Sequence, residues 1–209
     1  MIDHRKKFWF RSAALAGLAA AALLVFVPQV RSQSTTAPQY NAKGELQTPT
    51  GFETWVFVGS NLGLGYKDDL AVTTAKETAH ADQQVFHNIY INPEAYAHFV
   101  ATHEFPDPTV LVMEIFTAAD KEPKGVVTKG VFDGDRVGLQ VAVKDSHSPH
   151  KHPRNWAYYI PQDVQVPSHP LHASSPASDD DECESCHHAH ASLDDVWVQF
   201  YPTLRKLIK

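Results

Sequence analysis

The sequence predicts a mainly β protein of the α+β class, built on an antiparallel sheet with a few short helices. Six short stretches are rich in bulky apolar residues, and most of them are separated by turn residues. Parallel strands need a crossover of about a dozen residues or more, so strands joined this closely are expected to pair antiparallel.

The strand candidates lie at residues 54–59, 86–92, 109–117, 129–132, 136–144 and 156–160. The third (TVLVMEIFT) is the strongest and is too apolar for an exposed edge. Gly134 and Asp135 predict a hairpin turn between the fourth and fifth candidates.

One helix is expected at residues 93–103 (PEAYAHFVATH). Pro93 suits the first helical position, and Glu94 complements the positive end of the helix dipole. Ala95 and Phe99 share one stripe, so this helix is expected to cover one face of the sheet.

Two stretches are polar and carry few apolar side chains to bury. Residues 33–49 are polar and predict a linker, after which residues 50–209 form a single domain. Outside the strand at 156–160, residues 145–182 are rich in His, Pro, Ser and Asp and predict a long surface excursion. Residues 193–207 close the chain with aromatic residues.

The N-terminus is typical of an export signal. Arg5, Lys6, Lys7 and Arg11 precede an uncharged run of 15 residues at 13–27, short of the roughly 20 that a spanning helix needs. We expect residues 1–32 to be a signal peptide cut before Gln33, with an uncleaved anchor as the alternative. Either arrangement places the domain outside the cytoplasm, and we expect it in the periplasm.

Charge narrows the range of partners. Removing residues 1–32 takes away five basic residues and one acidic residue, which leaves 13 basic and 23 acidic residues and a formal charge of −10. An acidic surface repels phosphate backbones, so nucleic acid is not an expected partner. A basic redox protein is compatible with this charge.

The sequence Cys183-Glu184-Ser185-Cys186-His187 is a C-x-x-C-H motif, the signal for covalent haem c attachment. Two thiols three residues apart can each add to one of the two vinyl groups of a porphyrin. The imidazole of the next residue is then carried to the iron, so His187 is the predicted metal ligand.

Two other uses of these cysteines are possible. A thioredoxin-like redox pair lacks the parallel βαβ pattern it requires. A zinc site built from the two thiolates with His187, His188 or His190 is the stronger alternative, although export sends the chain to the compartment where haem c is attached. His188 and His190 are themselves expected on the surface.

Several segments together resemble the cytochrome P-460 family, whose relatives include cytochrome c′-beta. They are FHNIYINP at 86–93, FPDPTVLVME at 105–114, VAVKD at 141–145, NWAYY at 155–159, CESCH at 183–187 and DVWVQFYPTL at 195–204. The resemblance covers most of the chain from Trp55 onward.

This resemblance implies a small, mainly antiparallel β protein, usually a homodimer, with one five-coordinate haem c, which we expect to pack against the sheet. Cys183 and Cys186 would form the thioethers and His187 the axial ligand. The other haem face would be open to a small molecule, nitric oxide or hydroxylamine. Members of the family either oxidise hydroxylamine or bind gases such as nitric oxide.

The hydroxylamine-oxidising members carry a lysine cross-link to the porphyrin. Met113 stands where we place that lysine, which predicts that the cross-link is absent unless Lys129 or Lys144 supplies it. We expect Phe57, Phe86, Met113 and Trp156 to line the distal pocket. Glu114 and the acids at 179–182 are candidates for a general base there.

Three functions follow from the sequence. The first is a cytochrome that binds a small nitrogen oxide or transfers single electrons. The second is a cross-linked hydroxylamine oxidoreductase, and the third is a haem-free secreted metal-binding protein.

Overall fold

The structure is a computed structural model that describes residues 36–65, 84–121, 130–150, 152, 154–163, 170–179 and 183–208. The expected signal peptide at 1–32, Lys129 and the acids at 180–182 lie outside the described residues. Residues Ser34–Lys209 form one compact unit. Within the described ranges, no helix is both long enough and apolar enough to cross a bilayer.

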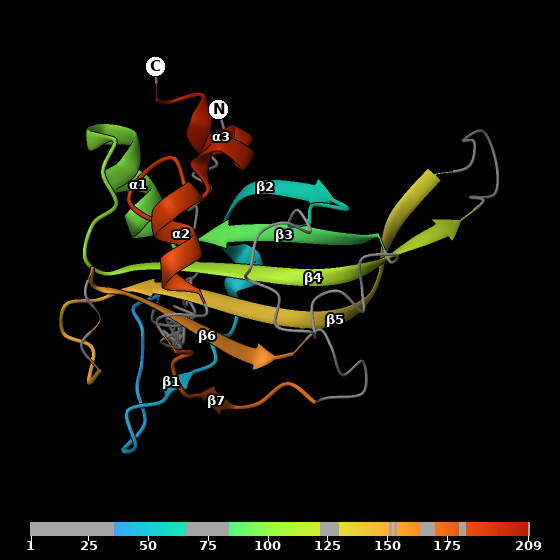
Figure 1. The fold of residues 1–209 in the computed structure, drawn as a ribbon. Helices are drawn as coiled ribbons and strands as arrows, with labels where there is room; N and C mark the ends of the chain where they lie inside the picture. The colour runs from blue at the N-terminus through green and yellow to red at the C-terminus, as the bar shows by residue number, and fades with distance from the viewer. Residues whose placement is uncertain are drawn as a thin grey trace, which may run out of the picture. The chain divides into compact units, whose positions relative to one another are not determined.

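The elements follow one another along the chain as β1 (Leu46–Gln47), η1 (Phe52–Thr54), β2 (Val56–Leu62), β3 (Val85–Ile91), α1 (Pro93–Thr102), β4 (Thr109–Lys121), β5 (Gly130–Lys144), β6 (Trp156–Gln162), β7 (Ser174–Ser175), α2 (Glu184–His190), η3 (Val198–Phe200) and α3 (Pro202–Arg205). Strands β2 to β6 form a five-stranded sheet in sequence order, and β1 pairs with β7 (Figure 1). Every pairing is antiparallel. The predicted mainly β, antiparallel fold with short helices is therefore confirmed.

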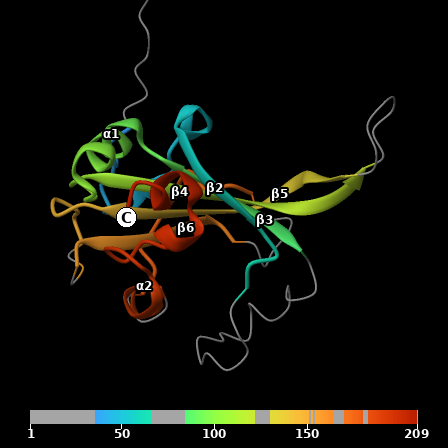
Figure 2. The same cartoon turned by 90° about the horizontal axis from the view of Figure 1, so that it is seen from above.

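The sheet is buried on both faces. Along β4, Leu111 and Met113 pack with one hydrophobic cluster, whereas Val110 and Val112 belong to the other. We call the first side the α2 face, because its cluster contains Tyr158, which contacts His187 of α2. Figure 2 shows α2 standing off one side of the sheet beside β6.

The α2 face also carries Val58, Ile89, Ile91 and Trp156, together with Phe99 of α1 and Leu204 of α3. The opposite face carries Leu46, Phe52, Trp55, Leu139, Val141, Val143 and Tyr159. Fully apolar central strands such as β4 follow from this two-sided burial.

The predicted hairpin turn at Gly134 and Asp135 is wrong. Strand β5 runs through both residues for 15 residues, and its partners on β4 extend from Thr109↔Lys144 to Lys121↔Gly130. The register shifts near Phe116 and Ala118 show that the Gly-Asp pair belongs to a β-bulge. The backbone N–H of Asp135 donates to Thr117 Oγ1 at 3.0 Å, which satisfies a donor that the bulge removes from the ladder.

The described part of the expected linker, residues 36–49, packs against the domain. Leu46 is 1 % exposed and pairs with Ser175 of β7. The hydroxyl of Tyr40 donates to Asp145 Oδ2 at 3.1 Å. The predicted surface excursion is also anchored, because Ser148 and Ser175 are buried.

The expected helix is confirmed as α1, which ends at Thr102. His103 caps it in the left-handed region (φ 63°), and its N–H donates to the carbonyl of Phe99 at 2.8 Å.

Substitution of Gly134 tests the bulge. A Cβ at this position would meet Thr117 Oγ1, and the Thr117 carbonyl oxygen at 3.0 Å. We expect Gly134→Ala to lower the free energy of unfolding by about 1–3 kcal/mol in urea titrations, because backbone must move. Gly65→Ala is the control, since a Cβ there meets nothing within 4 Å. Equal effects from both substitutions would contradict the bulge geometry.

Candidate functional site

Helix α2 brings the C-x-x-C-H residues together. Cys183 is the N-cap residue, and Cys186 and His187 lie one turn further along. Cys186 is buried, while Cys183 is half-buried and packs against the cluster on the α2 face. Residues three apart on a helix share one side, so both thiols are directed to the same region. No disulfide joins them.

Both ring nitrogens of His187 have hydrogen-bonding partners. Nδ1 lies 2.8 Å from the backbone carbonyl oxygen of Asp195, so Nδ1 carries the proton and donates. The indole N–H of Trp197 donates to Nε2 at 3.1 Å, so Nε2 presents its lone pair. The imidazole also packs on Tyr158, with ring centroids 4.5 Å apart.

Burial lowers the pKa of His187 below its usual value, although the Asp195 carbonyl and carboxylate act in the opposite direction. The ring is therefore neutral near pH 7. A neutral imidazole whose Nδ1–H is held by a carbonyl is the form that binds a metal through Nε2.

Charged groups surround the base of α2. Glu184 is buried, and Arg154 donates from Nη1 to its Oε1 at 2.5 Å. Asp195 is also buried, and its Oδ1 lies 3.0 Å from Nδ1 of His188. His188 and His190 are exposed, as expected.

The sequence did not identify three groups that contact the His187 ring, namely Tyr158, Asp195 and Trp197. Asp195 and Trp197 follow the motif within ten residues, and their position in a polar and aromatic segment is the only local signal. Tyr158 comes from β6, so only the fold brings it to this site.

The four residues expected to line a distal pocket are divided between the two faces. Met113 and Trp156 lie on the α2 face, with His187. Phe57 contacts Tyr90, which packs with the cluster on the opposite face. Phe86 lies four residues before Tyr90 on β3, so the two side chains point to the same face. Side-chain alternation therefore places Phe57 and Phe86 on the face away from the cluster beside His187, and their role in lining a distal pocket stays a prediction.

The two residues that remain differ in exposure. Trp156 is 0 % exposed, contacts Phe105 edge-on and donates from Nε1 to Asp194 at 3.4 Å, so it is a core residue. Met113 is half-buried, between Ile89 and Gln140 on the neighbouring strands. His87 occupies the α2 face two residues before Ile89, and burial lowers its pKa.

The side chain of Lys144 has two hydrogen-bond acceptors outside the motif. Its Nζ donates to the Phe105 carbonyl at 2.9 Å and to Asp194 Oδ2 at 2.8 Å. Glu114 pairs with Arg136 and alternates with Met113, which places it on the opposite face. This position argues against Glu114 as a base beside His187.

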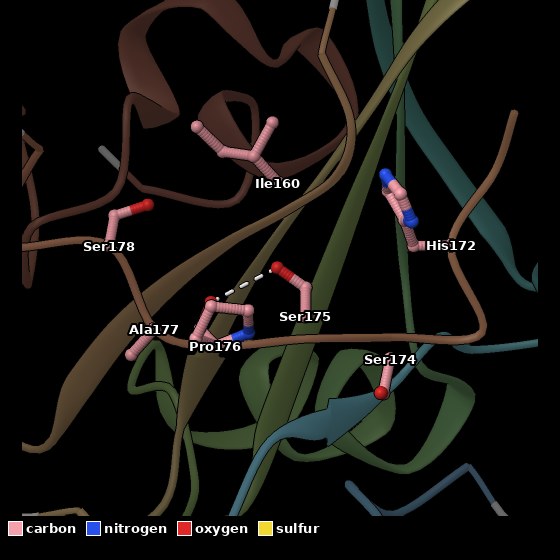
Figure 3. Close-up of a pocket in the computed structure, with 7 residues that line it drawn as sticks. All are labelled: Ile160, His172, Ser174, Ser175, Pro176, Ala177 and Ser178. Carbon is pink, nitrogen blue, oxygen red and sulfur yellow. Dashed lines mark hydrogen bonds between the residues drawn. The ribbon is translucent and has the colours of Figure 1, made fainter. Parts of the chain in front are cut away.

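Among the described residues, the only group of three metal-ligand atoms within 4.8 Å of one another comprises Asp107, Asp145 and His147. In the part of the chain that the structure describes, the ligand atoms of Cys183, Cys186 and His187 do not form such a group. A cavity of about 370 Å³ is lined by Ile160, His172 and Ser174 to Ser178 (Figure 3). A second cavity of about 260 Å³ lies beside Lys144 and Asp194, and no residue of the C-x-x-C-H motif lines either.

Comparison with models of known protein families identifies the family of this chain. The family model described as Cytochrome P460 matches residues 49–198, which include the C-x-x-C-H motif. This chain belongs to the cytochrome P460 family. A comparison with curated proteins found no match. Membership of the P460 family implies a haem cofactor.

The residues at α2 fit such a group. Two thiols one helical turn apart lie beside a neutral imidazole, and its Nδ1 is already engaged. The single lone pair of Nε2 can accept the Trp197 N–H or bind iron, but it cannot do both.

A pH series tests the surroundings of Glu114. Burial raises the pKa of this carboxyl above its usual value, although Arg136 lowers it. The native state then holds the Glu114 proton more tightly than the unfolded state does. The free energy of unfolding therefore falls as pH rises from the pKa of Glu114 in the unfolded state through its pKa in the folded state. We expect the free energy of unfolding of Glu114→Gln, relative to wild type, to increase over this interval.

Urea titrations between about pH 4 and pH 7 measure this difference. Glu45→Gln is the control, because hydrogen bonds from Asn41 and Ser174 lower the pKa of Glu45, so its contribution to stability has the opposite sign. A difference for Glu114→Gln that falls with pH would contradict the assignment.

Proposed function

We propose that this protein is an exported c-type cytochrome with one haem, bound through thioethers to Cys183 and Cys186 and through its iron to His187. The second axial position is open to a small nitrogen oxide such as nitric oxide. The observation that carries the proposal is the tautomer of His187. Its Nδ1–H donates to the Asp195 carbonyl at 2.8 Å, so Nε2 is the nitrogen that would bind iron, in place of the hydrogen bond that it accepts from Trp197.

The chain's own residues would perform two tasks. Cys183 and Cys186 would hold the haem through thioethers, in which the S–H of each thiol has added across one vinyl group. Asp195 and Tyr158 orient the imidazole from two sides. Bound haem supplies an open coordination position and a one-electron redox couple.

The side chains of the α2 face favour a neutral ligand. Ile89 on β3 and its partner Met113 on β4 point to this side, and so does Ile115, two residues after Met113. An apolar wall excludes anions because a buried charge without a partner is costly. His87 adds one imidazole, kept neutral by burial, that can exchange a hydrogen bond with a polar diatomic.

Hydroxylamine oxidation has less support. Met113 occupies the position at which we expect the cross-linking lysine, and Lys144 is held by Phe105 and Asp194. Single-electron transfer is the second candidate function, favoured by the formal charge of −10 after removal of residues 1–32. That charge suits a basic redox partner in the periplasm. A homodimer is part of the same proposal.

Removal of each thiol tests the attachment. In a host able to mature haem c, we expect Cys183→Ala and Cys186→Ala each to lose one thioether, and the double variant to lose covalent haem altogether. The pyridine haemochrome α band should move to longer wavelength with each loss, and intact-protein mass should report the bound haem. Ser185→Ala, exposed between the two cysteines, is the control. A colourless wild-type protein that holds zinc on these thiols would falsify the proposal.

The ligand is tested with the haem-loaded protein, with nitric oxide added to the reduced form and azide added to the oxidised form. We expect nitric oxide to shift the Soret band and azide to bind weakly or not at all, because the wall of the α2 face is apolar. The mass should equal that of the chain plus haem at two cysteines, with no third attachment, and hydroxylamine should not reduce an added electron acceptor. A third attachment with hydroxylamine turnover would instead support the enzyme.

A further inference from the structure

A tight turn supplies the carbonyl that holds His187. Asp194 and Asp195 have positive φ angles of 47° and 58°, and the N–H of Val196 donates to the carbonyl of Leu193 at 2.8 Å. Two successive left-handed residues within such a bond define a type I′ turn. Residues other than glycine rarely adopt this conformation, and aspartate and asparagine tolerate it best.

Both aspartate side chains are anchored by other elements. Asp194 accepts from Nζ of Lys144 on β5 at 2.8 Å and from Nε1 of Trp156 on β6 at 3.4 Å. Asp195 lies 3.0 Å from Nδ1 of His188 and 4.0 Å from Nε of Arg154. Arg154 also binds Glu184, so it connects the turn to the first residue of α2.

We propose that the Asp194–Asp195 turn is the device that positions His187, and that Lys144 and Arg154 are positioning residues that act through it. The left-handed conformation directs the Asp195 carbonyl toward Nδ1 of His187, and the anchored carboxylates hold that conformation. The proposal rests on the proposed role of His187 as an axial ligand.

A chemical consequence follows for the ligand. A firm Nδ1–H···O=C bond fixes the ring orientation and makes Nε2 more basic. A more basic ligand strengthens the iron–histidine bond and favours ferric over ferrous haem. A turn released from its anchors should therefore weaken that bond and raise the reduction potential.

The experiment uses the haem-loaded full chain. Lys144→Met and Asp194→Ala remove the anchor on Asp194, and Lys144→Arg and Asp194→Asn are the conservative variants. Lys43→Met is the matched control, because Lys43 is exposed in a loop outside the site. Resonance Raman spectroscopy of the ferrous protein gives the iron–histidine stretching frequency, and a redox titration gives the potential.

We expect a lower stretching frequency and a higher potential in Lys144→Met and Asp194→Ala, recovery in the conservative variants and no change in Lys43→Met. Fully haem-loaded variants with unchanged frequency and potential would overturn the proposal. Equal shifts in Lys43→Met would do the same.

A second readout does not depend on haem. Long-range ¹⁵N–¹H NMR of haem-free protein reports the His187 tautomer, which we expect to be Nδ1–H in wild type and mixed in Lys144→Met. A wild-type protein that never acquires haem contradicts the proposed function, whereas a tautomer insensitive to the turn contradicts only this inference. Urea midpoints for all variants identify any that fail to fold, and Lys144→Met and Asp194→Ala test the anchor independently.

Discussion

Side-chain alternation along β4 is the constraint on which the molecule depends. Because β4 is the central strand of the sheet, its odd and even residues feed two separate hydrophobic clusters. One cluster supports α2 and the C-x-x-C-H motif, and the other is closed by β1 and η1. On β3 and β4, the residues that face the same side as α2 are therefore those that alternate in step with Ile89 and Met113.

The site is built from segments distant in sequence. Helix α2 supplies the thiols and the imidazole, β6 supplies Tyr158, and the turn before η3 supplies the carbonyl of Asp195. Lys144 and Arg154 tie that turn to the sheet and to α2. Glu184, Asp194 and Asp195 thus have a structural role as acceptors.

Three features of the strands could not be decided from the local sequence. Gly134 and Asp135 have the composition of a hairpin turn, but a bulge needs the same small, permissive residues, and pairing with β4 decides between the two. Phe57 and Phe86 are apolar strand residues, and composition does not say which face of a sheet receives His187. Lys144 is a strand lysine whose partner, Asp194, lies far along the chain.

By itself the sequence determined the antiparallel β class, the helix after Asn92, the family resemblance and the three residues of the motif. These are local properties, since strand periodicity, a proline at a helix start and C-x-x-C-H spacing are all encoded within a few neighbouring residues. The tertiary structure decided which strand residues face His187, which of its nitrogens is protonated and what holds the Asp195 carbonyl. These features depend on long-range pairing and burial, which local patterns do not specify.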